Sequence, residues 1–129
     1  MSENKPKTIC KILTVDDQMG IDSFFYEFFT ARNYEVFNAL SGKEAIKIVQ
    51  KERPRIILLD INMRGMDGIE TLKRIKEIDP SIDVIMVTAV NDIGSAGTAI
   101  KFGAKDYVVK PFDVDDILNR TRSIIIKSQ

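Results

Sequence analysis

The chain has 129 residues, enough for one domain of ordinary size, since a second domain would need roughly 100 more residues. Its 19 Lys and Arg residues balance its 19 Asp and Glu residues, so net charge gives no sign of a nucleic-acid binder. The lack of His excludes Ser–His and Cys–His catalysis, haem ligation by His and a His phosphoryl carrier within this chain. The single cysteine, Cys10, excludes an internal disulfide and a multi-cysteine metal site.

The first seven residues are polar and lack the apolar stretch of a signal peptide. We therefore expect a disordered tail over residues 1–7, followed by one domain over residues 8–129. Apolar runs such as Ile56 to Leu59 are far shorter than the ~20 residues that cross a bilayer. These features predict a soluble, cytoplasmic protein with no membrane partner.

Short runs of apolar residues predict five strands, at residues 12–15, 34–37, 56–59, 84–87 and 107–109. Near-continuous runs of this kind are typical of parallel strands that are buried on both faces. The run at 34–37 is the weakest of the five. It is included because it lies between a turn and a capped helix.

Between these runs, apolar residues at helical spacing predict five helices, with stripes at residues 21–28, 45–49, 69–75, 93–100 and 114–125. Ser41 and Glu44 form a capping box, Asp113 can cap the last helix, and Gly103 stands where the fourth helix should stop. Five strand–helix units with right-handed crossovers favour a doubly wound α/β sheet of parallel strands.

Polar residues stand where these strands end. Asp16 and Asp17 follow the first strand, Asp60 the third, Thr88 the fourth and Lys110 the fifth. Parallel strands that run the same way end on one edge, and ligands bind there at the point where strand order reverses. If the first and third strands are neighbours, three carboxylates converge and repel one another unless a cation lies among them. Hard oxygen ligands of this kind favour Mg²⁺ or Mn²⁺.

Carboxylates, a divalent cation, a hydroxyl and an ammonium group around one cleft suit phosphoryl transfer. Asp60 is the natural nucleophile, Lys110 and the metal neutralise phosphoryl oxygens, and Thr88 donates a hydrogen bond. Gly65 and Gly68 in the following loop would give a bulky phosphoryl group room. Each of these residues alone is more often a cap, a turn or a strand residue. Their joint placement at successive strand ends is what favours the functional interpretation.

Several segments in this order resemble the receiver domain of bacterial two-component response regulators: Val15-Asp16-Asp17, Leu58-Leu59-Asp60, Met63, Gly65-Met66-Asp67-Gly68, Val87-Thr88-Ala89, Gly103-Ala104 and Lys110-Pro111-Phe112. The resemblance covers about residues 9–126. It implies a flavodoxin-like fold with strand order 2-1-3-4-5 and five helices. Within the family, the chain looks most like the single-domain intermediates of sporulation phosphorelays.

The resemblance also implies a role for each site residue. Asp60 would be the phosphoacceptor, and Mg²⁺ would be bound by Asp17, by Asp60 and by the backbone carbonyl of Asn62. Asp16 would contribute to the metal through water, and Lys110 would contact the phosphoryl group.

The same resemblance predicts how the domain switches. Thr88 would turn toward the phosphoryl group, Tyr107 would follow it, and the Lys110–Pro111 bond would be cis. The face formed by the fourth helix, the fifth strand and the fifth helix would then bind a downstream protein. One departure is Arg64, which stands where the family usually has a proline. We expect it to loosen the loop and to add a positive charge near the phosphoryl group, which affects the phosphoryl lifetime.

The expected phosphodonor is a sensor histidine kinase or a His-phosphotransfer protein. The chain would promote only its own phosphorylation and dephosphorylation, and it carries no recognisable DNA-binding motif. It is either a complete single-domain regulator or the receiver of a longer DNA-binding response regulator. A flavodoxin-like FMN binder and a Mg²⁺-dependent hydrolase are the weaker alternatives, because Asp16 and Asp17 would repel phosphate and Asn62 stands where a hydrolase usually has a second Asp.

Overall fold

The computed structural model describes residues 8–63, 65, 67–89 and 93–127, so the tail predicted over residues 1–7 lies outside the described residues, as does Arg64. Within them, five strands alternate with five helices. The strands are β1 (Lys11–Val15), β2 (Glu35–Ala39), β3 (Ile56–Asp60), β4 (Asp83–Ala89) and β5 (Asp106–Lys110). The helices are α1 (Met19–Thr30), α2 (Gly42–Glu52), α3 (Gly68–Ile78), α4 (Ile93–Lys101) and α5 (Val114–Lys127).

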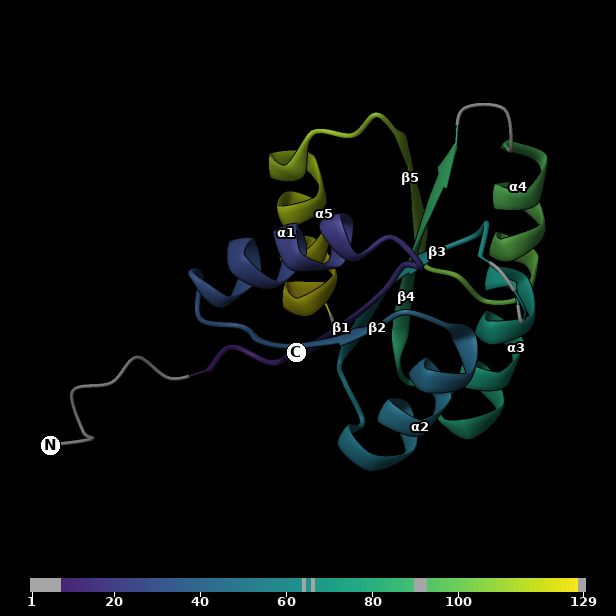
Figure 1. The fold of residues 1–129 in the computed structure, drawn as a ribbon, viewed down its shortest axis with the longest axis horizontal. Helices are drawn as coiled ribbons and strands as arrows, with labels where there is room; N and C mark the ends of the chain where they lie inside the picture. The colour runs from purple at the N-terminus through teal and green to yellow at the C-terminus, as the bar shows by residue number, and fades with distance from the viewer. Residues whose placement is uncertain (1–7, 64, 66, 90–92, 128–129) are drawn as a thin grey trace, which may run out of the picture.

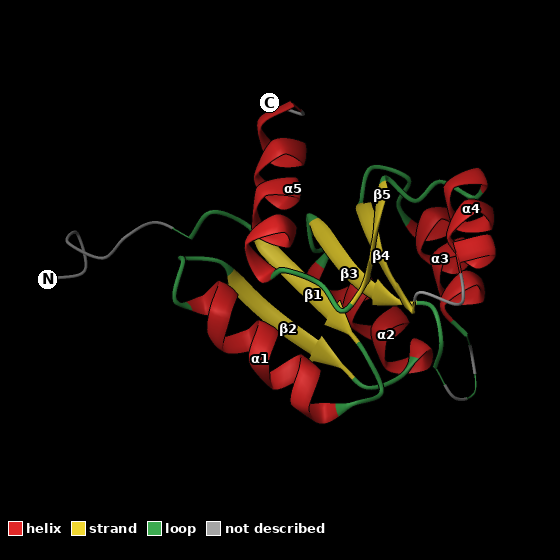
Figure 2. Ribbon diagram, turned by 90° about the horizontal axis from the view of Figure 1, so that it is seen from above, coloured by secondary structure: helices red, strands yellow, loops and turns green. Residues whose placement is uncertain are grey.

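The strands form one parallel sheet in the order β2-β1-β3-β4-β5, which confirms the predicted fold class and strand order. Helices α1 and α5 cover one face of the sheet, and α2, α3 and α4 cover the other (Figures 1 and 2). Because all five strands point the same way, their carboxyl ends lie along one edge. The order reverses between β1 and β3, and a ligand site is expected at that point.

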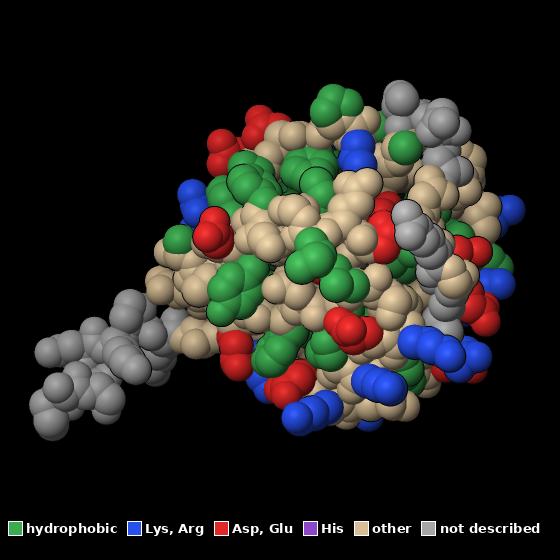
Figure 3. All heavy atoms as spheres, in the orientation of Figure 1, with side chains coloured by type: hydrophobic (Ala, Val, Ile, Leu, Met, Phe, Trp, Pro, Cys, Tyr) green, Lys and Arg blue, Asp and Glu red, His purple; other side chains and the backbone are tan. Residues whose placement is uncertain are grey.

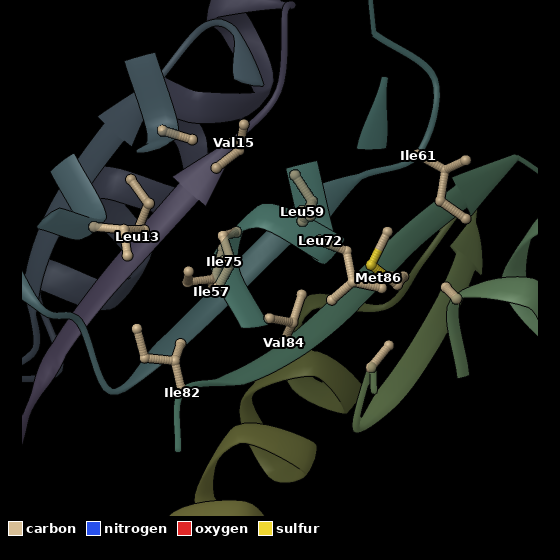
Figure 4. Close-up of a cluster of buried hydrophobic side chains, with 14 of the residues drawn as sticks. Leu13, Val15, Ile57, Leu59, Ile61, Leu72, Ile75, Ile82, Val84 and Met86 are labelled. Atoms are coloured by element: carbon tan, nitrogen blue, oxygen red, sulfur yellow. The ribbon is translucent and has the colours of Figure 1, made fainter. Parts of the chain in front are cut away.

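The core lies in two layers, one on each side of the sheet. Alternate strand residues such as Leu13, Ile57 and Val84 pack against α2, α3 and α4 (Figure 4). Their neighbours, such as Ile12 and Ile56, pack against α1 and α5. All five residues of β3 are buried. This two-sided burial explains why the strands appear in the sequence as continuous apolar runs.

The predicted helix caps are present. The Ser41 hydroxyl accepts a hydrogen bond from the Glu44 backbone N–H at 3.2 Å, and Asp113 accepts one from the Asp115 N–H at 2.9 Å. The Glu44 carboxylate, however, accepts from the backbone N–H of Leu40, one residue before the one that a standard capping box uses. Gly103 ends α4 with a φ of +105°, which glycine adopts without strain.

Two expectations need correction. The apolar stripe predicted over residues 21–28 includes Phe24, but this residue is 45% exposed, because Asp22, Phe25 and Phe29 face the interior instead. The second strand begins one residue later and ends two residues later than predicted, since it pairs along the whole of β1. None of the described helices is long and apolar enough to span a membrane.

Candidate functional site

Three carboxylates meet at the edge where the strand order reverses. Asp16 and Asp17 follow β1, and Asp60 ends β3, the strand next to β1. One carboxylate oxygen from each residue lies within 4.8 Å of the other two. Asp16 and Asp60 are buried, and Asp17 is half-buried. The convergence predicted from the strand ends is therefore present.

Lys110 supplies positive charge at the same place. Its Nζ lies 3.5 Å from Asp16 Oδ2 and 3.8 Å from Asp60 Oδ2. It reaches them from the end of β5, which lies two strands away from β3. The Lys110–Pro111 peptide bond that follows is cis, as expected from the resemblance.

The environment of Asp60 disfavours its charged form. Burial raises the pKa of Asp60 to about 6, and the Asp16 carboxylate adds to the rise. The Lys110 ammonium and the Asn62 backbone N–H, which donates to Asp60 Oδ1 at 3.2 Å, act in the opposite direction on this pKa. A divalent cation among the three carboxylates would also lower the pKa of Asp60 and leave it ionised at neutral pH.

The loop after Asp60 is held close to the strand that it leaves. The Gly68 backbone N–H donates to the Ile61 carbonyl at 2.9 Å, and a Cβ at Gly68 would lie 2.6 Å from Ile61 Cα and against the Asp60 carbonyl oxygen. Gly68 is thus needed for close approach of the backbone, which differs from the expected role of making room for a phosphoryl group. Gly65 has a φ of +75°, in the left-handed region that favours glycine.

Thr88 and Tyr107 lie at different heights on adjacent strands. Thr88 is fully buried near the carboxyl end of β4, next to β3, and its hydroxyl donates to the Ala89 carbonyl at 3.3 Å. In the sheet register Thr88 is opposite Val109, and Tyr107 is opposite Met86. Tyr107 is therefore diagonal to Thr88, three residues before Lys110. Tyr107 is 36% exposed, so part of its surface faces solvent.

The donor set of this cluster fits a hard divalent cation. Three carboxylates within 4.8 Å provide oxygen ligands only, which suits Mg²⁺ or Mn²⁺ better than metals that prefer nitrogen or sulfur. The Lys110 ammonium, one positive charge beside three carboxylates, balances only part of their charge. The cluster is thus an acidic site whose ligand atoms suit a cation, and it brings together carboxylates and an ammonium group of the kind that phosphoryl transfer uses.

A comparison with protein-family models identifies the chain's relatives. Residues 12–122 match the model described as the response regulator receiver domain. The chain belongs to this family. It is therefore the receiver domain of a two-component or phosphorelay system, and receiver domains bind Mg²⁺ at an acidic pocket of this kind.

Curated relatives of this receiver include both short and long proteins. It is 44% identical over 115 residues to sporulation initiation phosphotransferase F of Bacillus subtilis, which covers 89% of this chain and 93% of that protein. It is 42% identical over 109 residues to the chemotaxis protein CheY of Listeria monocytogenes, covering 84% and 92% of the two chains. It also matches the probable transcriptional regulator ycf27 of Cyanophora paradoxa at 35% identity, but spans only 49% of that longer protein.

Solved structures agree with this assignment. A receiver domain protein from Clostridium thermocellum superimposes with a TM-score of 0.88 at 28% identity, over 93% of this chain and 97% of that one. The receiver part of NtrX from Brucella abortus superimposes with a TM-score of 0.87 at 29% identity, over 92% of this chain and 27% of that one. The flavodoxin-like receiver fold is therefore shown.

One buried polar cluster beneath the site was missed by the sequence analysis. The Thr14 hydroxyl donates to Asp22 Oδ1 at 3.0 Å, and the Asn38 amide donates to Thr14 Oγ1 at 2.5 Å and to the Asp22 carbonyl at 3.1 Å. Asp22 Oδ2 is buried and has no hydrogen-bond partner among the residues that the structure describes. The sequence did contain a signal for this cluster: the spacing of three residues between Asp22 and Phe25 places Asp22 on the same face of α1 as Phe25, and this face is buried.

This cluster leads to a prediction about stability. Burial raises the pKa of Asp22 to about 7, with Asp16 and Glu44 adding to the rise and the Thr14 hydroxyl opposing it. Since the unfolded chain loses this proton near pH 4, the stability of the wild type falls as pH rises from about 4 to about 7. Asp22→Asn lacks this loss. The difference in unfolding free energy between the variant and the wild type should therefore grow by roughly 2 kcal/mol in favour of the variant between about pH 5 and about pH 8.

Urea unfolding at several pH values tests this expectation, with Asp115→Asn on the exposed surface of α5 as a control for the lost charge. A gain of the same size in Asp115→Asn would contradict it, as would a difference between Asp22→Asn and the wild type that does not change with pH.

Proposed function

We propose that this receiver is phosphorylated on Asp60 with the help of a divalent cation and that it passes on the signal by changing the surface of α4, β5 and α5. One observation supports the proposal above the others: Asp16, Asp17 and Asp60 converge within 4.8 Å, and Lys110 lies within 4 Å of two of them. Labelling of the chain by acetyl phosphate, or by a phosphorylated histidine kinase, tests it directly.

In the proposed reaction, a carboxylate oxygen of Asp60 attacks the phosphorus of a phosphohistidine in line with the leaving imidazole. The phosphorus–nitrogen bond breaks, a phosphorus–oxygen bond to Asp60 forms, and the imidazole leaves with the electron pair and takes up a proton. Lys110 neutralises charge on the phosphoryl oxygens from the side of β5. A histidine kinase or His-phosphotransfer protein supplies the phosphoryl group, because this chain contains no His.

The metal is assigned to Asp17, Asp60 and the backbone carbonyl of Asn62, with Asp16 acting through water. When bound, Mg²⁺ supplies charge neutralisation and a fixed place for a phosphoryl oxygen. Asp16 also accepts a hydrogen bond from the Gln18 backbone N–H at 2.9 Å, so its carboxylate helps to hold the turn that presents Asp17.

We expect labelling by acetyl phosphate to require Mg²⁺ or Mn²⁺ and to be lost when EDTA removes the metal. Asp17→Ala should weaken metal affinity most, because it removes a direct ligand, and Asp16→Ala should have a milder effect. Calorimetric titration with MgCl₂ measures both affinities. Undiminished labelling in EDTA would contradict the assigned role of the carboxylates.

The proposed switch couples Thr88 to Tyr107. Thr88 reaches the phosphoryl group only by moving its hydroxyl toward Asp60, away from the Ala89 carbonyl. That movement vacates space on the face of the sheet that Thr88 shares with Tyr107. The half-exposed ring of Tyr107 can then turn inward, which changes the surface next to α4.

Thr88→Ala should leave phosphorylation nearly intact and weaken the switch. A hydrogen bond to a charged group contributes roughly 1.5–3 kcal/mol, whereas moving an equilibrium from 1:99 to 99:1 takes about 5.5 kcal/mol. The variant should therefore switch in part. Amide NMR shifts of residues 93–112, with and without beryllofluoride, measure this, and a full wild-type shift pattern in Thr88→Ala would exclude Thr88 as the coupling residue.

We infer that the output is a contact with a downstream protein, or transfer of the phosphoryl group to a His-phosphotransfer partner. The near-full-length match to sporulation initiation phosphotransferase F and to CheY supports this. The match to longer transcriptional regulators keeps a second arrangement open, in which the same receiver controls a DNA-binding domain.

A further inference from the structure

A basic groove lies between α2 and α3, on the opposite face of the sheet from α1 and α5. It has a volume of about 350 Å³ and is lined by Lys43, Ile46 and Lys47 from α2 and by Arg74 from α3. Lys and Arg side chains gather over these two helices in the space-filling view (Figure 3). The chain as a whole has no net charge, so this is a local excess of positive charge.

The two lysines of this groove have no carboxylate partner in the part of the chain that the structure describes, and its arginine has one long ion pair. Among residues 8–63, 65, 67–89 and 93–127, no carboxylate lies within ion-pair distance of Lys43 or Lys47. The acidic residues of α2 are engaged elsewhere, since Glu44 accepts from the Leu40 N–H and Glu52 pairs with Lys11 at 3.1 Å. Arg74 has only a 3.9 Å contact with Glu70, and both of these side chains are about half exposed.

This arrangement is unfavourable for the isolated domain. Lys43 and Lys47 are four residues apart on one helix, where like charges repel and destabilise. Arg74 adds a third positive charge from the opposite wall of the groove. Ile46 is half-buried between them, so the groove combines positive walls with an apolar floor that continues into the core. An anionic partner with an apolar side chain would satisfy both features at once.

We propose that the groove between α2 and α3 is a docking surface for an acidic segment of a partner protein, with carboxylates on Lys43, Lys47 and Arg74 and an apolar side chain on Ile46. A small phosphate ligand fits it less well, because the lining consists of side chains along two helices and an apolar residue, without converging backbone N–H groups. This surface is separate from α4, β5 and α5, so the receiver can hold a second partner while it signals.

The test uses the whole chain, labelled with ¹⁵N, and a blocked nonapeptide of three Glu-Glu-Leu repeats as the probe. We expect amide shift changes that centre on residues 43–47 and on residue 74. Lys43→Glu/Lys47→Glu should weaken binding of the peptide by about tenfold or more. Arg74→Glu should also weaken it, because this variant removes the positive charge that α3 contributes to the groove. Binding should also weaken as NaCl rises from about 50 mM to about 300 mM.

Lys101→Glu/Lys127→Glu is the matched control, because it makes the same change in net charge on exposed residues of α4 and α5. Equal weakening in this control would overturn the proposal, as would shift changes spread over the whole surface or no binding of the probe. If inorganic tripolyphosphate produced the same shift changes more strongly than the peptide, the ligand of the groove would be a small anion, and the proposed acidic segment would be wrong. Asp60→Asn lacks the proposed phosphoacceptor. Because it should bind the probe as the wild type does, the outcome of the docking experiment does not depend on whether the receiver is phosphorylated.

Discussion

Replacement of Asp60 by asparagine is expected to lower labelling by acetyl phosphate or by a phosphorylated kinase by about a hundredfold or more, because the attacking oxyanion is lost. The shape of the side chain is kept, and the Asn62 N–H can still donate to the remaining carbonyl oxygen. Labelling with ³²P, followed by treatment with hydroxylamine, measures the effect. Phosphate on the wild type that resists hydroxylamine would contradict an aspartyl phosphate.

The same substitution should stabilise the fold at neutral pH. Burial, with the Asp16 carboxylate, raises the pKa of Asp60 to about 6 in the folded state, so the folded protein holds a proton that the unfolded chain releases near pH 4. The stability of the wild type therefore falls as pH rises from about 4 to about 6, and Asp60→Asn should escape this loss. We expect a gain of roughly 1–2 kcal/mol at about pH 7.5 without metal. Urea unfolding checks it, and Mg²⁺ should reduce the difference by stabilising the wild type alone.

Replacement of Gly68 by alanine is expected to cost about 3 kcal/mol of unfolding free energy. The new Cβ would press on the Asp60 carbonyl oxygen and would lie 2.6 Å from Ile61 Cα and 2.9 Å from the Ile61 carbonyl oxygen. All three atoms belong to the backbone, so no side chain can move aside to make room. Because the crowded segment includes Asp60, the rate of labelling by acetyl phosphate should fall as well.

Gly20→Ala in α1 is the matched control, since a Cβ at Gly20 meets nothing within 4 Å. Alanine lowers the conformational entropy of the unfolded chain, so this control should be neutral or more stable by about 0.5–1 kcal/mol. Urea denaturation compares the two variants. If Gly68→Ala were as stable as Gly20→Ala, the loop after Asp60 would have to be looser than the structure describes.

Local patterns in the sequence were enough to predict most of the secondary structure. The apolar runs at residues 12–15, 56–59 and 84–87 lie within β1, β3 and β4, because a strand buried on both faces is apolar at nearly every position, with the buried Thr14 as the exception in β1. The caps at Ser41 and Asp113 are also local, since each bonds a backbone N–H two or three residues away. The face of α1 was harder to predict, because a buried Asp22 and an exposed Phe24 both break the apolar pattern.

The sequence by itself determined which residues of this receiver could form a site: it placed Asp16, Asp17, Asp60, Thr88 and Lys110 after successive apolar runs. Only the tertiary structure decided that three of them meet within 4.8 Å, because the meeting depends on β1 and β3 being neighbours in the sheet. It also decided the close contact of Gly68 with β3 and the burial of Asp22 against Thr14 and Asn38. These contacts join residues from different elements. Apolar periodicity in a sequence shows which face of an element is buried, but it does not show which residues of another element that face meets.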